Sequence, residues 1–151
     1  MIFVCAMTMA QTNAYPLLPM PQNYKVTDKS FAMGKVKLST PVLKSEWEAF
    51  IVNAGGELAD KAAAEIKVEL LPVIDGVKLN PDEAYRLSVS GKLIKIEAVT
   101  ERGVYWALQT LRQLEKKKGK KSLFAGCEIV DWPAFRIRGF MQDVGRSYIS
   151  V

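Results

Sequence analysis

The residues with the clearest chemical potential lie near the end of the chain, between Asp131 and Arg146. This segment places three arginines and two aspartates among aromatic residues and glycines. Arg138 precedes a glycine and an apolar pair, as if a strand began there and pointed the guanidinium to one side. Its planar fork of N–H donors suits a pair of sugar hydroxyls or a carboxylate. The alternative is that Arg138, Asp143 and Arg146 form only a structural ion-pair network.

The chain contains no histidine. Within these residues, this excludes a Ser-His-Asp or Cys-His nucleophile, a histidine-ligated metal and a histidine proton shuttle. Any catalysis by these residues would depend on carboxylates, Lys, Tyr or Cys. The two cysteines, Cys5 and Cys127, do not make a disulfide framework. We expect no metal site and no cofactor in this chain.

The composition is that of an ordinary folded domain, with 151 residues, 49% hydrophobic, 25% charged and a net charge of +5. A chain of this length can bury roughly 70% of the surface that it exposes when unfolded. That is enough for one core and leaves no room for two large domains. Six positive charges lie between Arg112 and Lys121, beside a glycine. We interpret this run as the solvated end of a helix and expect no nucleic-acid partner, since no nucleic-acid-binding motif accompanies it.

An apolar stretch from Ile2 to Ala10 opens the chain. It is too short to cross a bilayer as a helix, which needs about 20 apolar residues, but long enough for the core of a signal peptide. Residues 1–14 are therefore predicted to be the remnant of an export signal. The protein would then be periplasmic, outer-membrane-associated or secreted, without a stable membrane span. A buried strand is the alternative, because the charged leader of a signal peptide is missing.

Alternation of apolar and polar residues predicts several β-strands. The clearest feature is a hairpin around Ser90-Gly91, in which Tyr85, Leu87 and Val89 share one face of the first strand. The hairpin strands cover Ala84–Ser90 and Lys92–Ala98, and further strands are predicted over Asn23–Val26, Lys35–Leu38, Glu65–Leu71 and Leu123–Val130.

Two helices are predicted between these strands. Ser45 can cap the first helix, which ends before Gly55-Gly56, and Ala59–Ala64 can resume a helical turn. Thr100 can cap the second helix, and Gly103 in its first turn permits close packing or a close approach of backbone. The apolar positions of the two helices are Trp47, Phe50 and Ile51, and Val104, Ala107, Leu108, Leu111 and Leu114. This order of elements predicts an α+β fold, an antiparallel sheet with two helices packed on one face.

Four segments resemble the family 20 glycoside hydrolases, the β-N-acetylhexosaminidases. The run D-W-P-x-F-x-x-R-G-F-M-x-D-x-x-R looks like the opening of their catalytic barrel. The segments L-L-P-M-P-Q, E-A-Y-R-L-S-V and R-G-V-Y-W-A-L-Q-T-L-R-Q-L are similar to their small accessory domain. The resemblance implies an accessory domain over residues 15–130. It also implies the truncated first strand of a (β/α)8 barrel over residues 131–151.

The resemblance also assigns roles to residues of the last segment. It implies that Arg138 binds the ring hydroxyls of the non-reducing sugar, and that Asp143 and Arg146 support the strand end. The sequence departs from the family pattern at Ala134, where Arg is frequent, and at Ser147, where His is common. Gln142 is unusual as well. These differences alter the sugar-binding end of the segment.

The catalytic residues of this family are an Asp-Glu pair farther along a barrel of about 250 residues. The Asp positions the substrate's acetamido group, whose oxygen is the nucleophile, and the Glu protonates the leaving oxygen. The resemblance therefore implies the non-catalytic N-terminal fragment of an exported β-N-acetylhexosaminidase, inactive alone. Its partners would be its own catalytic barrel and, through that barrel, an N-acetylhexosamine-containing glycan. The alternative is a stand-alone carbohydrate-binding or structural domain without an active parent enzyme.

Overall fold

The alternating apolar residues build a central sheet that carries two helices. The computed structural model describes residues 16–139. The strands are β1 (Asn23–Val26), β2 (Phe31–Ala32), β3 (Lys35–Ser39), β4 (Glu57–Leu58), β5 (Ala64–Leu70), β6 (Tyr85–Ser90), β7 (Leu93–Ala98), β8 (Glu115–Lys118), β9 (Lys121–Phe124) and β10 (Cys127–Asp131). The helices are α1 (Lys44–Asn53), α2 (Glu101–Gln113) and the short 3₁₀ helix η1 (Pro81–Glu83). A seven-stranded sheet has the order β1-β10-β6-β7-β5-β3-β4, and a three-stranded sheet the order β2-β9-β8.

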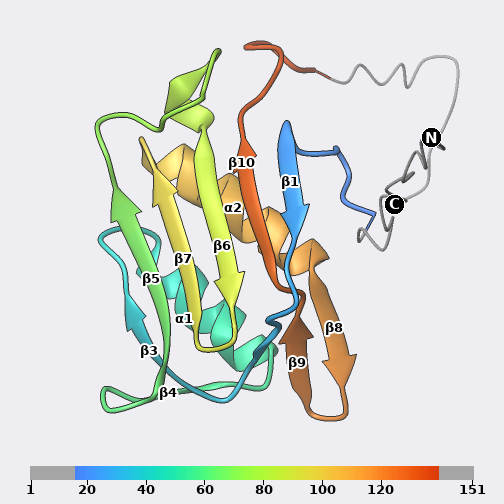
Figure 1. The fold of residues 1–151 in the computed structure, drawn as a ribbon. Helices are drawn as coiled ribbons and strands as arrows, with labels where there is room; N and C mark the ends of the chain where they lie inside the picture. The colour runs from blue at the N-terminus through green and yellow to red at the C-terminus, as the bar shows by residue number, and fades with distance from the viewer. Residues whose placement is uncertain (1–15, 140–151) are drawn as a thin grey trace, which may run out of the picture.

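Both helices lie on the same side of the seven-stranded sheet (Figure 1). The predicted α+β class, with a sheet and two helices, is confirmed. The prediction of an antiparallel sheet is wrong for part of the sheet, because β3 pairs in parallel with β5, and β5 with β7. Helix α1 lies between β3 and β5 in the sequence, and such a crossover connection returns the chain in the same direction. Strands β1, β10, β6 and β7 are antiparallel neighbours.

The apolar faces of the sheet and of the helices meet in one large core. Thr100 caps α2 as predicted, since its hydroxyl accepts a hydrogen bond from the backbone N–H of Arg102 at 3.2 Å. Burial of one large apolar side chain contributes about 1.5–3 kcal/mol, so this core dominates the stability of the fold. Its members on α2, β6 and β7 are Val104, Ala107, Leu108, Leu111, Tyr85, Leu87, Val89, Ile94, Ile96 and Ala98, and Leu114 follows α2.

Helix α1 begins differently from the prediction. Its N-cap is Leu43, in the left-handed region at φ 53°, and no side chain caps the helix. Ser45 lies inside the helix, where its hydroxyl donates a hydrogen bond to the Glu46 carboxylate at 2.9 Å. The predicted N-cap is therefore wrong, because the Ser45 hydroxyl is bonded to a neighbouring carboxylate. The apolar positions Trp47, Phe50 and Ile51 are buried as predicted.

Two further segments differ from the sequence prediction of helix. The stretch Ala59–Ala64 forms a turn and the start of β5 rather than a helical turn. Strand β4 precedes it and joins the edge of the sheet, with Glu57 N–H bonded to Gly34 C=O at 2.9 Å. The lysine run does not end a helix but forms β8, which pairs with β9 around Gly119 at φ 65°. Burial of Ser122 and Phe124 fixes one face of this hairpin against the body.

The predicted strand Leu123–Val130 is divided into β9 and β10 at Ala125-Gly126. The break coincides with a close approach between two segments of backbone. A Cβ on Gly126 would lie 2.5 Å from the carbonyl oxygen of Lys29. Only glycine fits this position, and the chain passes there from the small sheet to the large one.

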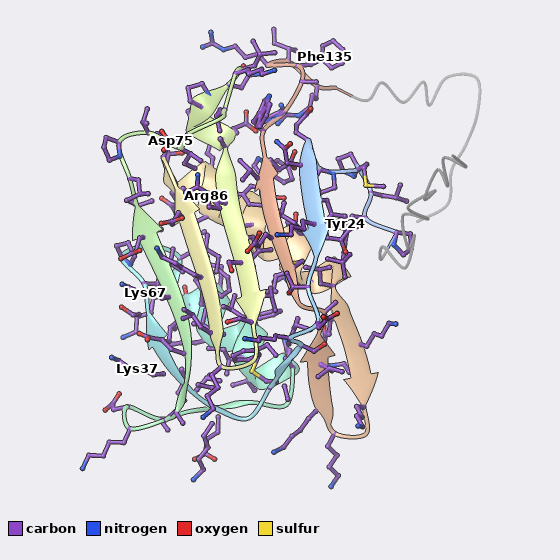
Figure 2. All side chains as sticks on the ribbon, viewed as in Figure 1. Tyr24, Lys37, Lys67, Asp75, Arg86 and Phe135 are labelled. Carbon is purple, nitrogen blue, oxygen red and sulfur yellow. The ribbon has the colours of Figure 1, made fainter. Side chains whose placement is uncertain are left out.

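The face of the large sheet opposite the helices is covered by paired charges. Figure 2 shows Lys37, Lys67 and Arg86 on this face. Lys95 lies 2.6 Å from a Glu97 oxygen and 3.1 Å from a Glu69 oxygen, and the Glu69 carboxylate also pairs with Lys67 at 2.8 Å. Arg86 continues the row through Glu97 at 3.2 Å. The row crosses β6, β7 and β5, and each of its charged groups has a partner of opposite sign.

The part of the chain after β10 has no regular secondary structure between Trp132 and Gly139. The barrel strand predicted over residues 131–151 is therefore not seen in its described portion, beyond the last residue of β10. Residues 140–151 and the predicted signal remnant, residues 1–14, lie outside the described residues. Within residues 16–139, neither helix is long and apolar enough to cross a membrane.

Candidate functional site

Arg138 is the sequence-predicted site residue that the structure describes, and it contacts the 3₁₀ helix and α2. Its Nη2 forms an ion pair with the Glu83 carboxylate, and its Nη1 donates to the Phe135 carbonyl oxygen at 2.6 Å. The guanidinium carbon also lies 5.8 Å from the centroid of the Trp106 ring, in a cation–π contact. Asp143 and Arg146, the other two predicted residues, lie outside the described part of the chain.

The Glu83 carboxylate is positioned by η1 and by the backbone around it. Asn80 precedes η1 in the left-handed region at φ 45°, and Pro81 starts the helical turn. The Asn80 side-chain amide donates to the Pro133 carbonyl oxygen at 2.8 Å. The same turn that presents Glu83 therefore also binds the segment that carries Arg138.

Helix α2 brings the Trp106 ring to the same place. The Trp106 indole N–H donates to the Glu83 carboxylate at 2.9 Å. This approach depends on Gly103, because a Cβ there would lie 2.2 Å from the Ala84 carbonyl oxygen. The prediction that Gly103 permits close backbone approach is confirmed. An ion pair between Arg102 and Asp82 at 3.0 Å adds a second link between α2 and η1.

The electrostatics of this cluster favour the ionised form of Glu83. Burial raises the pKa of the Glu83 carboxyl, but hydrogen bonds from Arg138 and Trp106 outweigh it, and the net pKa is lowered. A general acid needs a raised pKa so that it keeps a proton to donate near neutral pH. Glu83 is therefore suited to holding a cation in place and is unsuited to protonating a leaving group.

A surface hollow of about 370 Å³ adjoins this cluster, and Tyr105 and Trp106 contribute two aromatic rings to it. These two rings are 5.2 Å apart and inclined at 74°, so they meet edge to face. A sugar platform made of both rings needs them to lie in one plane, and this pair does not form one. The remaining residues lining the hollow are Leu43, Glu83, Glu101 and Arg102.

A second polar cluster joins β10 to α2 at one end of the sheet. The Tyr85 hydroxyl lies 2.6 Å from the Thr110 hydroxyl and donates to the Asp131 carboxylate at 3.3 Å. The backbone N–H of Gln22 donates to the other Asp131 oxygen at 3.0 Å. Burial raises the pKa of the Asp131 carboxyl, which these donors oppose, and burial raises the pKa of the Tyr85 hydroxyl as well. The cluster fixes the chain before β1 to the last strand.

The remaining nucleophile candidate is Cys127, which lies fully buried on β10. Burial raises the pKa of its thiol to about 12, so the thiol stays protonated at neutral pH. A protonated, buried thiol is neither a nucleophile nor a metal ligand. Among residues 16–139, no three acidic or cysteine side chains gather in a way that could hold a metal ion.

Sequence reasoning singled out Arg138 but not the two side chains that hold it. No sequence pattern distinguishes Trp106 or Glu83 as a partner of Arg138. The only signal for Glu83 is its place in the first turn after Asn80-Pro81. Its partner Arg138 is 55 positions away, and local patterns carry no information about such a contact.

The arrangement of the fold is that of a domain found in glycoside hydrolases. The structure superposes on the exo-β-N-acetylglucosaminidase of Vibrio harveyi with a TM-score of 0.68 and 31% identity, covering 90% of this chain and 22% of that one. The β-N-acetylhexosaminidase of Bacteroides fragilis gives a TM-score of 0.65 at 22% identity, with coverages of 91% and 29%, and shows the fold alone.

The family follows from the sequence itself. The model of glycosyl hydrolase family 20, domain 2, matches residues 14–132, and the chain belongs to this family. A β-hexosaminidase of Porphyromonas gingivalis is 27% identical over 89% of this chain, and one of Vibrio furnissii is 35% identical over 59% of it. The chain spans 19% and 14% of the lengths of these two relatives.

Proposed function

We propose that this chain supplies the non-catalytic accessory domain of an exported β-N-acetylhexosaminidase and stabilises the catalytic barrel that follows it. The parent enzyme would remove terminal N-acetylhexosamine residues from glycans by the substrate-assisted retaining route. The observation that carries the proposal is the match of residues 14–132 to domain 2 of the family, in relatives that are named β-hexosaminidases.

The described residues support a role in positioning rather than in chemistry. Glu83 is ionised, Cys127 is protonated and buried, and Asp131 is held in a structural hydrogen-bond cluster. The exit segment, residues 132–139 after β10, is attached to the domain through Trp132, which is packed against Ile74 and Ala84, and through the hydrogen bond from Asn80 to Pro133. Because the exit segment is fixed to the domain, the polypeptide that follows it starts from a fixed position relative to the domain.

Arg138 would keep its role as a sugar ligand within this arrangement. A guanidinium has five N–H donors, and the contacts with Glu83 and Phe135 use two of them. The Arg138 side chain remains 42% exposed. The unused donors can therefore bind sugar hydroxyls while Glu83 holds the group in place.

An activity assay of the 151-residue chain tests the proposal. We expect no release of p-nitrophenol from p-nitrophenyl-N-acetylglucosaminide above the buffer control, whereas a chain extended through a downstream barrel should turn the substrate over. Sequencing the gene beyond Val151 should also identify an Asp-Glu pair on a barrel strand. Enzyme-level turnover by the 151-residue chain would refute the non-catalytic role.

A stand-alone carbohydrate-binding domain is the second candidate, and the hollow beside Tyr105 and Trp106 is the feature that it would use. The inclined rings and the Arg138 guanidinium over Trp106 argue against a stacking platform. Titration with N-acetylglucosamine oligomers separates the two candidates. Saturable binding that Tyr105→Ala removes would favour the binding domain.

A further inference from the structure

The net positive charge of the chain is concentrated in one hairpin. Of the 21 Lys and Arg residues and 16 Asp and Glu residues, five lysines and one glutamate lie between Glu115 and Lys121, so this stretch carries +4 of the net +5. All six residues from Lys116 to Lys121 are exposed. The hairpin β8–β9 extends from the end of the molecule opposite the exit of β10 (Figure 1).

The pairing of the strands gathers the lysines on one side. Lys118 is directly opposite Lys121, and Lys116 is opposite Leu123, so these three lysines share a face. Lys120 lies beside them in the turn. Like charges placed directly opposite each other on neighbouring strands are destabilising. The fold therefore gains no stability from this arrangement, and an external anion would relieve the repulsion.

The lysines on the large sheet differ from those of the hairpin. Lys25, Lys35 and Lys67 each pair with a glutamate, at 3.6, 3.8 and 2.8 Å. In the hairpin, Lys117 pairs with Glu115 at 2.6 Å. Within residues 16–139, no carboxylate forms an ion pair with Lys118, Lys120 or Lys121. The tip is thus a place where cationic charge is left uncompensated by the domain.

Protection of an edge strand explains part of this pattern. Strand β8 is at the edge of the three-stranded sheet, and lysines on an edge strand prevent pairing with another chain. Lys120 lies in the turn and Lys121 on the inner strand β9, so neither protects that edge. A second reason is needed for these two lysines.

We propose that the tip of the β8–β9 hairpin, formed by Lys118, Lys120 and Lys121, binds the surface of an anionic phospholipid membrane. Clustered lysines bind such surfaces through the summed attraction of compact charges, without a shaped pocket. The hairpin offers an exposed tip without arginine forks or aromatic rings, which recognition of nucleic acid commonly uses. A flat anionic surface matches this tip better than a polymer that must lie in a groove. The proposal does not depend on the proposed function.

Co-sedimentation of the 151-residue chain with vesicles tests the proposal. We expect binding to vesicles of phosphatidylglycerol and phosphatidylcholine in 0.1 M salt, no binding to phosphatidylcholine alone, and loss of binding at high salt, where charges are screened. The triple variant K118Q/K120Q/K121Q should lower the partition coefficient by about 100-fold, because each lysine near an anionic surface contributes substantially. The variant K118R/K120R/K121R should retain binding, because it keeps the charge.

The matched control removes the same charge from the paired lysines of the sheet, in K25Q/K35Q/K67Q. It should change the partition coefficient by less than about threefold, since these lysines belong to pairs on the large sheet and none belongs to the tip. Equal losses in the two glutamine variants would overturn the proposal, because binding would then follow net charge alone. Absence of wild-type binding to the anionic vesicles, or tighter binding to heparin or single-stranded DNA than to them, would overturn it as well.

Discussion

At the scale of single residues, Glu83 connects three parts of the domain. Its carboxylate accepts a hydrogen bond from Trp106 on α2 and pairs with Arg138 in the exit segment. The residue itself belongs to η1. A single buried anion with two donors from distant segments holds those segments in one geometry, whereas an unpaired carboxylate at the same depth would oppose folding.

We predict that Glu83→Gln lowers the free energy of unfolding by about 1 kcal/mol at pH 7. The amide oxygen of Gln can still accept from Trp106, so the substitution removes mainly the charge that pairs with Arg138. Urea denaturation provides the measurement. Asp82→Asn is the control, because its partner Arg102 is 69% exposed and the pair contributes little.

The same variant has a defined pH dependence. The folded state lowers the pKa of the Glu83 carboxyl from its ordinary value of 4.5. A lowered pKa stabilises the fold at pH values above 4.5, and this contribution is lost as the pH falls through the folded value. The difference in unfolding free energy between wild type and Glu83→Gln should therefore be constant above about pH 6 and shrink below 4.5. A difference that grows in acid would contradict the assignment.

At the scale of elements, the packing of α2 against η1 depends on the absence of a side chain at Gly103. A Cβ at this position would lie only 2.2 Å from the Ala84 carbonyl oxygen, far below any van der Waals contact. The helix must therefore move away from the sheet if any larger residue is placed there. That movement would also withdraw Trp106 from Glu83.

We predict that Gly103→Ala destabilises the domain by about 2 kcal/mol, although alanine is the better helix former by about 1 kcal/mol. Thermal or urea unfolding measures the loss of stability, and the near-ultraviolet circular dichroism, compared with wild type, measures the change in aromatic packing. Gly91→Ala is the matched control, since no atom lies within 4 Å of a Cβ at that turn. An increase in stability for Gly103→Ala would show that the helix does not pack as closely as described.

The elements that sequence reasoning placed correctly are those with a local signal. The hairpin of β6 and β7 alternates in hydrophobicity, and Thr100 with the stripe of α2 marks a helix start. Parallel pairing of β3, β5 and β7 has no such signal, because it depends on how the crossover connections return. Strand β8 consists of one glutamate and three lysines, so it has no hydrophobic period at all.

The residues of the candidate site also differ in whether the sequence alone indicates them. Arg138 stands out by residue type and by its glycine and aromatic neighbours. Glu83 and Trp106 become visible only when η1, α2 and the exit segment are brought together in three dimensions. The lowered pKa of the Glu83 carboxyl, which makes it unsuited to act as a general acid, results from its contacts with Arg138 and Trp106. No sequence pattern indicates these contacts.

At the scale of the whole molecule, the exit segment is a part of the domain rather than a loose connection. Trp132 is 8% exposed and packs with Ile74 and Ala84 in a small second core. Phe135, three positions later, is 73% exposed. Anchored and solvated side chains therefore alternate along this segment, since Trp132 and Arg138 contact the domain whereas the Phe135 ring is exposed.

We predict that Trp132→Ala lowers the unfolding free energy by about 3 kcal/mol, as expected for the loss of a large buried aromatic side chain. Phe135→Ala should leave it unchanged within about 0.5 kcal/mol, because the ring is solvated. Both are measured by urea denaturation of the 151-residue chain. If the two variants were equally stable, the second core would not contribute to holding the exit segment.

The position of β10 in the large sheet also determines when strand pairing can be completed during folding. In the large sheet, β1 is an outer strand whose neighbour is β10, and β10 separates it from β6. On a ribosome, the first strand of this domain is made long before the strand that will bind it. Strand β1 therefore remains unpaired until Cys127–Asp131 has been synthesised and can insert between β1 and β6. Such distant pairing makes folding slow, and the domain becomes complete only when nearly all of its sequence has been synthesised.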